Sequence, residues 1–345
     1  MIHAENPSAR RLPRRLRQGS KIGVLSPSAS VPSFFPERLA RGEAELRRLG
    51  FEVSRGEHAT ARTGYTAGTP HERVAELHRF FADPDIDAVH LTIGGNNSNQ
   101  MLDLIDYDLL RTNPKILVGY SDSTALINAV AHMTGSVTFH GPAVLPEFGE
   151  YPSLHPYTER AFLNVTCHAV PSLAFEPPEF WTQEFAEWGE PENWERSRDL
   201  SDPASWCSLA EGSVEGRLVG GNLETLLKLA GTPYWPDLEG AIFFWEEGRQ
   251  SVALVDSHLS QLKQMGVFDR IAGMVVGRPY HCDDSTGVSF DQLISRELSG
   301  VPFPVLADVD LGHTDPMVTL PIGIRARLEV SAQGFSFSLL EPAVR

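Results

Sequence analysis

Cysteine is scarce in this 345-residue chain, and long apolar runs are missing. The three cysteines, Cys167, Cys207 and Cys282, are widely spaced and odd in number. They therefore do not suggest the disulfide framework of a small secreted protein, and they fit reduced thiols in a cytoplasm. No stretch approaches the roughly 18 consecutive apolar residues of a membrane-spanning helix. We expect a cytoplasmic protein with no membrane partner.

Basic residues are also few, with 29 lysines and arginines against 45 acidic residues and a formal net charge of −16. The first 21 residues alone carry +5, so the remainder carries −21. A body of this charge repels phosphate backbones and anionic lipid, which argues against nucleic acid as a partner. Residues 1–19 are interpreted as a disordered basic extension, because neither an apolar segment nor a small-residue cleavage site follows them.

Short apolar segments alternate with amphipathic ones in the N-terminal half of the chain. Strands are expected at 21–25, 51–53, 88–92 and 116–118, and helices at 37–49 and 73–81. This alternation predicts an α/β fold with a parallel, flavodoxin- or Rossmann-like sheet that helices cover on both faces. In such a sheet, ligands gather at the carboxyl ends of the strands. We expect this domain to span residues 20–165.

The alternation is interrupted over residues 166–210 and then returns. Further strands are expected at 241–245, 273–276 and 328–330, within a second domain over 211–345. The intervening segment is rich in proline and acid, and it holds four of the six tryptophans. A linker that forms a lid over a cleft is one interpretation, because aromatic faces stack on nucleobases. Tryptophans that pack one domain against the other are the alternative.

The segment Gly119–Thr124 follows an apolar run and precedes a helix-like stretch. A serine at such a strand-to-helix turn, here Ser121, is lifted out of the sheet beside the amides that begin the helix, as in a nucleophile elbow. The usual elbow has glycine two residues later, where this chain has Ser123. Ser121 is therefore a candidate nucleophile, with a simple helix N-cap as the alternative.

A glycine-rich loop, Thr92–Gln100, stands at another strand end. Gly94 and Gly95 let the backbone approach a ligand closely, and their amides are able to hold an oxyanion. The loop lacks the spacing of a dinucleotide-binding motif. A polar loop that uses glycine only for its conformation is the alternative.

Two further candidates are a carboxylate pair, Glu246 and Glu247, at the end of a strand, and His313 in a loop before the strand-like residues 317–320. A carboxylate at the end of a buried strand is costly unless it is hydrogen-bonded or functional. The chain order Ser, Glu, His occurs in serine hydrolases, although a triad is defined by geometry and not by order.

A metal site is not expected. His281, Cys282, Asp283 and Asp284 are all ligand types, but four consecutive residues do not converge easily on one ion, and no second pair follows at zinc spacing.

Eight ordered motifs between residue 17 and the C-terminus resemble the LD-carboxypeptidase family of serine peptidases. They are Lys21–Val24 with Ser26–Ser28, Thr92–Gln100, Asn113–Lys115, Gly119–Thr124, Phe139–Pro142, Gly220–Leu223, Gly231–Tyr234 and Gly312–His313. The asparagine-rich loop from Gly94 and the tryptophan-rich insert look more like the microcin C immunity branch of the family than its muropeptide-recycling branch.

The resemblance implies a role for each matching residue. Ser121 is the expected nucleophile, His313 the general base and then acid, and Glu246 the residue that orients His313, with Glu247 as a less favoured alternative. The amides of Gly95 and Asp122 are the expected oxyanion donors, and the expected substrate contacts are Gly94, Asn222, Trp188 and Arg249. The resemblance also implies a C-terminal domain with a β-barrel-like sheet, a homodimer, and no cofactor.

These observations predict a serine hydrolase that cleaves an amide in a peptidyl- or aminoacyl-nucleotide antibiotic of the microcin C type. The alternative within the same chemistry is cleavage of an L,D bond in a cell-wall peptide. A noncatalytic protein that binds a small ligand is the alternative of another class.

Overall fold

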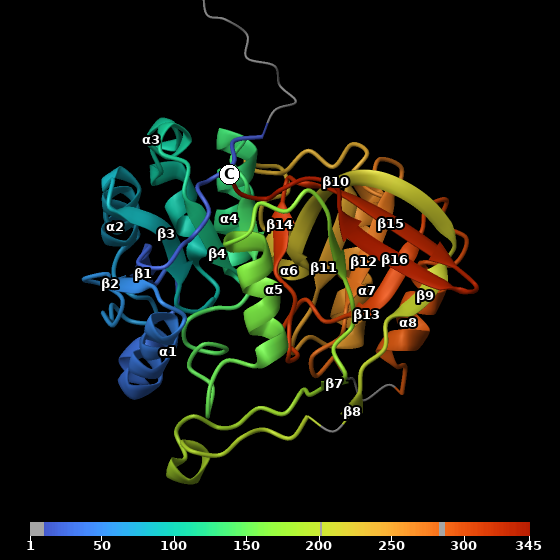
Figure 1. The fold of residues 1–345 in the computed structure, drawn as a ribbon. Coiled ribbons are helices and arrows are strands. Elements are labelled where there is room, and N and C mark those ends of the chain that lie inside the picture. The colour runs from blue at the N-terminus through green and yellow to red at the C-terminus, as the bar shows by residue number, and fades with distance from the viewer. Residues whose placement is uncertain (1–9, 201, 283–286) are drawn as a thin grey trace, which may run out of the picture.

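The computed structural model describes residues 10–200, 202–282 and 287–345. These residues form two main sheets, with the blue-to-green half of the chain beside the yellow-to-red half (Figure 1). The α/β fold predicted from the sequence is confirmed. In the described ranges, none of the helices is long and apolar enough to cross a membrane.

The first sheet has six strands in the order β14-β5-β4-β3-β1-β2. Five of them are parallel: β1 (Lys21–Leu25), β2 (Glu52–Arg55), β3 (Ile86–Leu91), β4 (Ile116–Gly119) and β5 (Thr138–His140). Their order, 2-1-3-4-5, is that of the flavodoxin-like doubly wound sheet, whose ligand crevice opens where β1 meets β3. The strands β3 and β4 are almost wholly buried, which explains the apolar sequence of β4 and the mainly apolar sequence of β3.

Among the described residues, five helices connect or follow these strands; the sequence pattern predicts the first, second and fourth of them but not the third and fifth. They are α1 (Pro36–Arg48), α2 (Pro70–Ala82), α3 (Tyr107–Thr112), α4 (Ser123–Thr134) and α5 (Pro156–Thr166), with short 3-10 turns η1 (Val31–Ser33) and η2 (Ser98–Leu104). Thr69 and Glu72 cap α2 reciprocally, which fixes its first residue. Gly135, in the left-handed conformation, ends α4.

The second sheet has eight strands in the order β6-β16-β15-β10-β11-β12-β13-β9. The strands are β6 (Leu173–Phe175), β9 (Cys207–Ala210), β10 (Gly212–Asn222), β11 (Ile242–Glu246), β12 (Gly273–Gly277), β13 (Val305–Val309), β15 (Arg325–Ser331) and β16 (Gly334–Leu339). A single residue, Glu211, joins edge strand β9 to β10, although three strands separate the two in the sheet. The sheet must therefore curl back on itself, and β9 contacts β15, which gives the expected barrel-like form.

Three helices accompany the second sheet, and one strand from the C-terminal half joins the first sheet instead. The helices are α6 (Leu223–Leu227), α7 (Val252–Gln264) and α8 (Phe290–Glu297). The strand β14 (Leu320–Ile322) comes from the C-terminal half, yet it pairs antiparallel with β5 at the edge of the first sheet. Figure 1 shows it in orange-red beside the green helices α4 and α5. The two halves are therefore not separable at one point of the chain.

Close packing of α4 on β10 also joins the halves. A Cβ atom on Gly221 would lie 2.5 Å from Oγ1 of Thr124, so only glycine permits this approach. Across the same contact, the amide of Asn222 donates to Thr124 Oγ1 at 2.9 Å, and Nδ2 of Asn128 donates to the carbonyl of Gly220 at 2.9 Å.

The expectation of disorder over residues 1–19 is wrong for residues 10–19. Leu16 is fully buried, and its amide donates to the carbonyl of Thr166 at 2.9 Å. The amide of Arg15 donates to the carbonyl of Arg345, the last residue, at 3.0 Å. The interpretation from the sequence relied on the charge of this segment. In the structure, Leu16 belongs to the hydrophobic core and Leu12 packs against it, and these apolar contacts order the segment. Residues 1–9 lie outside the described part of the chain.

The tryptophan-rich segment is only partly a linker or lid. Its ends form the edge strands β6 and β9, and β7 (Phe180–Trp181) pairs with β8 (Asp202–Pro203). Edge strands of two to four residues are too short to show an alternating pattern, so the sequence did not reveal them. Residues 182–200 remain irregular apart from the turn η3 (Pro191–Asn193) and form the yellow-green loop at the bottom of Figure 1. We call residues 182–200 the insert.

Candidate active site

Ser121 lies in the turn between β4 and α4 with a φ of 59°, an uncommon value for serine. Its Oγ is 3.0 Å from Nε2 of His313. The N-cap residue of α4 is Asp122, whose carboxylate makes no capping bond and accepts from the amide of Ser98 at 2.8 Å. Ser121 therefore does not serve as a simple helix cap. A strained turn that presents its hydroxyl to a histidine has the form of a nucleophile elbow.

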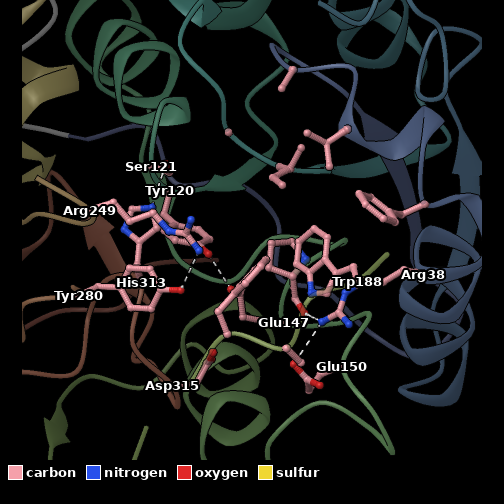
Figure 2. Close-up of a pocket in the computed structure, with 18 of the residues that line it drawn as sticks. Arg38, Tyr120, Ser121, Glu147, Glu150, Trp188, Arg249, Tyr280, His313 and Asp315 are labelled. Atoms are coloured by element: carbon pink, nitrogen blue, oxygen red, sulfur yellow. Dashed lines mark hydrogen bonds and ion pairs between the residues drawn. The ribbon is translucent and has the colours of Figure 1, made fainter. Parts of the chain in front are cut away.

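A second hydrogen bond extends this contact. Nδ1 of His313 lies 2.7 Å from Oε2 of Glu246, the last residue of β11 (Figure 2 shows the histidine beside Ser121). Glu246 is completely buried, and Gly312 makes the approach possible, because a Cβ there would lie 2.5 Å from Glu246 Oε2. With Nδ1–H donating to the carboxylate, Nε2 is free to accept the hydroxyl proton of Ser121.

The charges of this pair support each other. Burial opposes the ionisation of Glu246, but the charge and hydrogen bond of His313 outweigh it and hold the pKa of Glu246 below its usual value. Burial likewise lowers the pKa of His313, yet the carboxylate of Glu246 outweighs it and raises that pKa above its usual value. The site therefore stabilises an imidazolium next to a carboxylate.

Glu247 belongs to a different group of contacts. Its Oε1 accepts from the amide of Glu224 at 2.8 Å and lies 3.1 Å from Nδ1 of His258. Burial raises the pKa of Glu247. Neighbouring residues of a strand point to opposite faces, so Glu246 and Glu247 cannot both face His313. The geometry favours Glu246 as the partner of His313.

The glycine-rich loop after β3 passes directly over the elbow. A Cβ on Gly94 would lie 2.9 Å from Cβ of Ser121 and 3.0 Å from the amide nitrogen of Asp122. Glycine at this position therefore keeps the space in front of that amide open. Gly95 follows with a φ of 148°, and it lines a cavity that Ser121 also lines. The loop that carries Gly94 and Gly95 therefore lies against the turn that carries Ser121 and Asp122, and the oxyanion role of the Gly95 and Asp122 amides stays a prediction.

Ser121 and His313 open into a cavity of about 470 Å³, a size typical of small-molecule sites. In Figure 2, Arg249 and Tyr280 lie with Ser121 and His313 at one end, and Arg38 and Trp188 lie at the other. Glu147 and Asp315 lie between the ends, and Glu150 lies beside Arg38. Gly94 and Ala29 place the cavity beyond the carboxyl ends of β1 and β3, where the doubly wound sheet predicts a ligand.

Trp188 is the tryptophan of the insert that lines this cavity. Its ring packs edge-on against Phe35 with 5.6 Å between centroids, and the guanidinium of Arg38 lies 4.4 Å from its centre. Trp194 and Trp206 make other contacts, outside the cavity lining. Trp206 is buried and donates from Nε1 to Asp310, which supports the packing interpretation for that residue. Trp194 is exposed, and its Nε1 donates to the carbonyl of Trp188 at 3.0 Å.

Arg249 and Asn222, both expected to contact substrate, differ in position. Arg249 lines the cavity, its guanidinium 4.8 Å from the ring centre of Phe185 and 5.6 Å from that of Tyr280. Asn222 is buried and does not belong to the cavity lining that the described residues form. It caps α6, and its side-chain amide lies close enough to Glu246 to help lower the pKa of that carboxyl. The structure therefore places Asn222 next to the buried carboxylate of Glu246, and its expected contact with substrate stays a prediction.

Several cavity residues were not found by sequence reasoning. Glu147 accepts from the hydroxyl of Tyr120 and from the amide of Ala143, each at 2.6 Å. Burial and the nearby charge of Asp315 raise the pKa of Glu147 to about 7. Arg198 reaches the cavity from the insert. No local motif marks these residues, because their contacts join segments far apart in the sequence.

The described residues include no group of three or more histidine, cysteine, aspartate or glutamate side chains that could hold a metal ion. Of the ligand types weighed in the sequence, Asp283 and Asp284 lie outside the described residues. The amide of His281 donates to Gln183 at 3.2 Å, and the Cys282 thiol faces the carbonyl of Glu247 at 3.5 Å.

A serine in a strained turn, bonded to a histidine that is bonded in turn to a buried carboxylate, is an arrangement typical of serine hydrolases. The chain belongs to the LD-carboxypeptidase family: residues 22–141 match the LD-carboxypeptidase N-terminal domain, and residues 215–328 match the C-terminal domain. The family resemblance drawn from the sequence motifs is thereby confirmed.

Among its relatives is the microcin C7 self-immunity protein MccF of Escherichia coli, 34% identical over 327 residues, which are 94% of each chain. The solved structure of MccF with aspartyl sulfamoyl adenosine superposes with a TM-score of 0.91 and 34% identity, over 97% of this chain and all of that one. The muramoyltetrapeptide carboxypeptidase of Oxalobacter formigenes superposes with a TM-score of 0.76 and 26% identity, over 92% and 98% of the two chains.

Proposed function

We propose that this protein is a serine hydrolase that cleaves an amide bond in a peptidyl- or aminoacyl-nucleotide of the microcin C type. The observation that carries the proposal is the continuous chain of hydrogen bonds from Ser121 through His313 to Glu246 at the end of a cavity. Such a chain activates a hydroxyl for acyl transfer without a metal or organic cofactor. We propose self-immunity or detoxification in the cytoplasm as the physiological role.

In the proposed reaction, Ser121 Oγ attacks the carbonyl carbon while Nε2 of His313 removes its proton. Glu246 keeps the ring in the right tautomer and stabilises the imidazolium that forms. The amides of Gly95 and Asp122 would hold the oxyanion, at roughly 3 to 4 kcal/mol for a donor of this kind. His313 then gives the proton to the leaving nitrogen, and water releases the acyl group by the same steps in reverse.

The far end of the cavity supports the choice of substrate. Trp188, with Phe35 and Arg38 around it, offers an aromatic ring for a nucleobase, and a stacked base is worth roughly 1 to 3 kcal/mol. Arg249, near the serine, offers a cation for a carboxylate of the aminoacyl part. The MccF structure with aspartyl sulfamoyl adenosine, a ligand that has a nucleobase and a carboxylate, is consistent with this assignment.

A panel of substrates tests the proposed function directly. Aminoacyl-sulfamoyl nucleosides should be hydrolysed with a kcat/KM at least about tenfold above that for a tetrapeptide ending in a D-residue, because only the former fill both ends of the cavity. Product release is measured by chromatography. The opposite preference would favour muropeptide cleavage, for which the match to the Oxalobacter carboxypeptidase is the supporting observation. No hydrolysis of either class, with no labelling by an active-serine reagent, would favour a ligand-binding protein.

The contribution of Trp188 is tested by replacing it with alanine. Trp188→Ala should raise KM for a nucleotide-linked substrate by roughly tenfold or more, about 1.4 kcal/mol, and should leave a minimal peptide substrate little affected. Trp188→Phe keeps an aromatic face and should recover part of the loss. Equal losses on both substrates, or a large fall in melting temperature, would assign Trp188 to packing alone.

A further inference from the structure

Arg198 is the centre of an ion-pair network that the proposed reaction does not use. Its Nη1 lies 2.7 Å from Oδ2 of Asp315, and its Nη2 lies 2.9 Å from Oε2 of Glu150. The three side chains are only 12 to 13% exposed. Solvent and salt therefore screen these pairs far less than pairs on the surface. Nη1 also donates to the carbonyl of Glu184, so the arginine is fixed to its own segment as well.

The partners of Arg198 come from separate parts of the fold. Glu150 lies between β5 and α5 in the first half of the chain, and it also pairs with Arg38 at 3.1 Å. Arg38 in turn donates to the carbonyls of Leu145 and Pro146. Glu150 is therefore held firmly in the first half. Arg198 belongs to the insert, and Asp315 belongs to the loop between β13 and β14, two residues after His313.

The insert also binds the loop between β13 and β14 through two backbone hydrogen bonds. The amide of Thr182 donates to the carbonyl of Asp315 at 2.7 Å, and the amide of Asp315 donates to the carbonyl of Thr182 at 3.0 Å. Asp315 is thus bound to the insert by its main chain and by its side chain. Irregular loops hold a side chain accurately only when such surrounding contacts fix them, and a general base needs placement to within about 0.5 Å.

We propose that Arg198 is a positioning residue that fixes His313 through Asp315. The insert then does more than line the substrate cavity, because it also holds the proposed general base in place against the first half of the chain. The assignment of His313 as the base rests on the proposed function, whereas the restraint on its loop does not.

The variant Arg198→Gln removes the charge and both ion pairs while keeping much of the side chain. Arg196→Gln is the matched control: Arg196 lies in the same insert and pairs with Glu184, but it is more exposed and its contacts stay within the insert. A fluorophosphonate reagent measures the reactivity of Ser121 without knowledge of the substrate. Arg198→Gln should lower the maximal labelling rate by about tenfold or more, with the concentration for half-maximal rate changed less than about twofold. Arg196→Gln should label like the native protein.

Hydrogen exchange reports on the loop independently of any reaction. The amide of Asp315 should exchange at least about tenfold faster in Arg198→Gln than in the native protein, and at the native rate in Arg196→Gln. An unchanged exchange rate in Arg198→Gln would overturn the proposal. Failure of the native protein to label or to hydrolyse any substrate would count against the proposed function, and the exchange measurement would still decide whether Arg198 restrains the loop.

If Arg198→Gln does not fold, Arg198→Lys and Asp315→Asn test the same pair. Lysine keeps the charge but reaches one carboxylate at a time, so it should keep part of the labelling rate. Asp315→Asn breaks the pair from the other side and should reproduce the loss. Combining Asp315→Asn with Arg198→Lys should then cost no more than the worse single change, because both act through one contact. Additive losses, or a native labelling rate in Asp315→Asn, would overturn the proposal.

Discussion

Ser121→Ala should lower kcat/KM by about a thousandfold or more and leave the fold intact. The hydroxyl is the proposed reactant, so only the rate that binding and the oxyanion site supply should remain. Its loss opens little volume, and circular dichroism and the melting temperature should match those of the native protein. The measurement is hydrolysis of the best substrate of the panel, with labelling by the fluorophosphonate as a second readout.

Ser123→Ala is the matched control for this change. Ser123 is the first residue of α4, two positions after Ser121; it is buried, and its Oγ has no hydrogen-bond partner among the described residues. Its replacement should keep the native rate to within about twofold. If Ser121→Ala retained more than about a tenth of the native rate, another group would have to be the nucleophile.

Glu246→Gln should cost about a thousandfold or more in kcat, and Glu247→Gln far less. A carboxylate accepts the Nδ1–H of His313 and stabilises the imidazolium, whereas an amide in its place is neutral and favours the wrong tautomer. Glu247 contacts Glu224 and His258 instead, so the same chemical change there leaves His313 untouched. A larger loss from Glu247→Gln than from Glu246→Gln would indicate that Glu247 is the third member of the triad.

The pH dependence of the residual rate gives a second test of Glu246. The reaction needs neutral His313, so kcat/KM should fall as the pH drops through the raised pKa of that histidine. Glu246 contributes most to raising this pKa, ahead of Glu147 and Glu247. In Glu246→Gln the fall should therefore move to lower pH, while in Glu247→Gln it should stay close to its native position.

Much of the first sheet was predictable, because several of its strands and helices carry a local signal, whereas β5, β14, α3 and α5 were not predicted. The strand β4 is a continuous apolar run, β3 is mainly apolar, and α1 and α2 each have one apolar face. Ser121, Glu246 and His313 were singled out because each follows or precedes such a run, and the geometry brings them within hydrogen-bonding distance. Their catalytic roles stay predictions.

What the sequence could not indicate depends on contacts between distant segments. Arg198 acquires its partners from residues about 48 positions before it and 117 after it, and no spacing rule relates such positions. Asn222 stood in a family motif, but only the fold shows that its amide lies close to Glu246. Residues 10–19 were misjudged because charge is visible in composition, whereas the buried position of Leu16 depends on α5 and the C-terminus.

The strand β14 has a consequence for how the molecule is made. His313 lies on a segment that connects β13 in the second sheet to β14 in the first, so both ends of this segment are held by a sheet. During synthesis, β5 emerges from the ribosome about 180 residues before the strand that covers its edge. An open strand edge invites pairing with other chains, so nascent or truncated chains ending before Leu320 should be prone to aggregate. Ser121 and His313 are 192 residues apart, so a growing chain acquires the proposed base long after the proposed nucleophile.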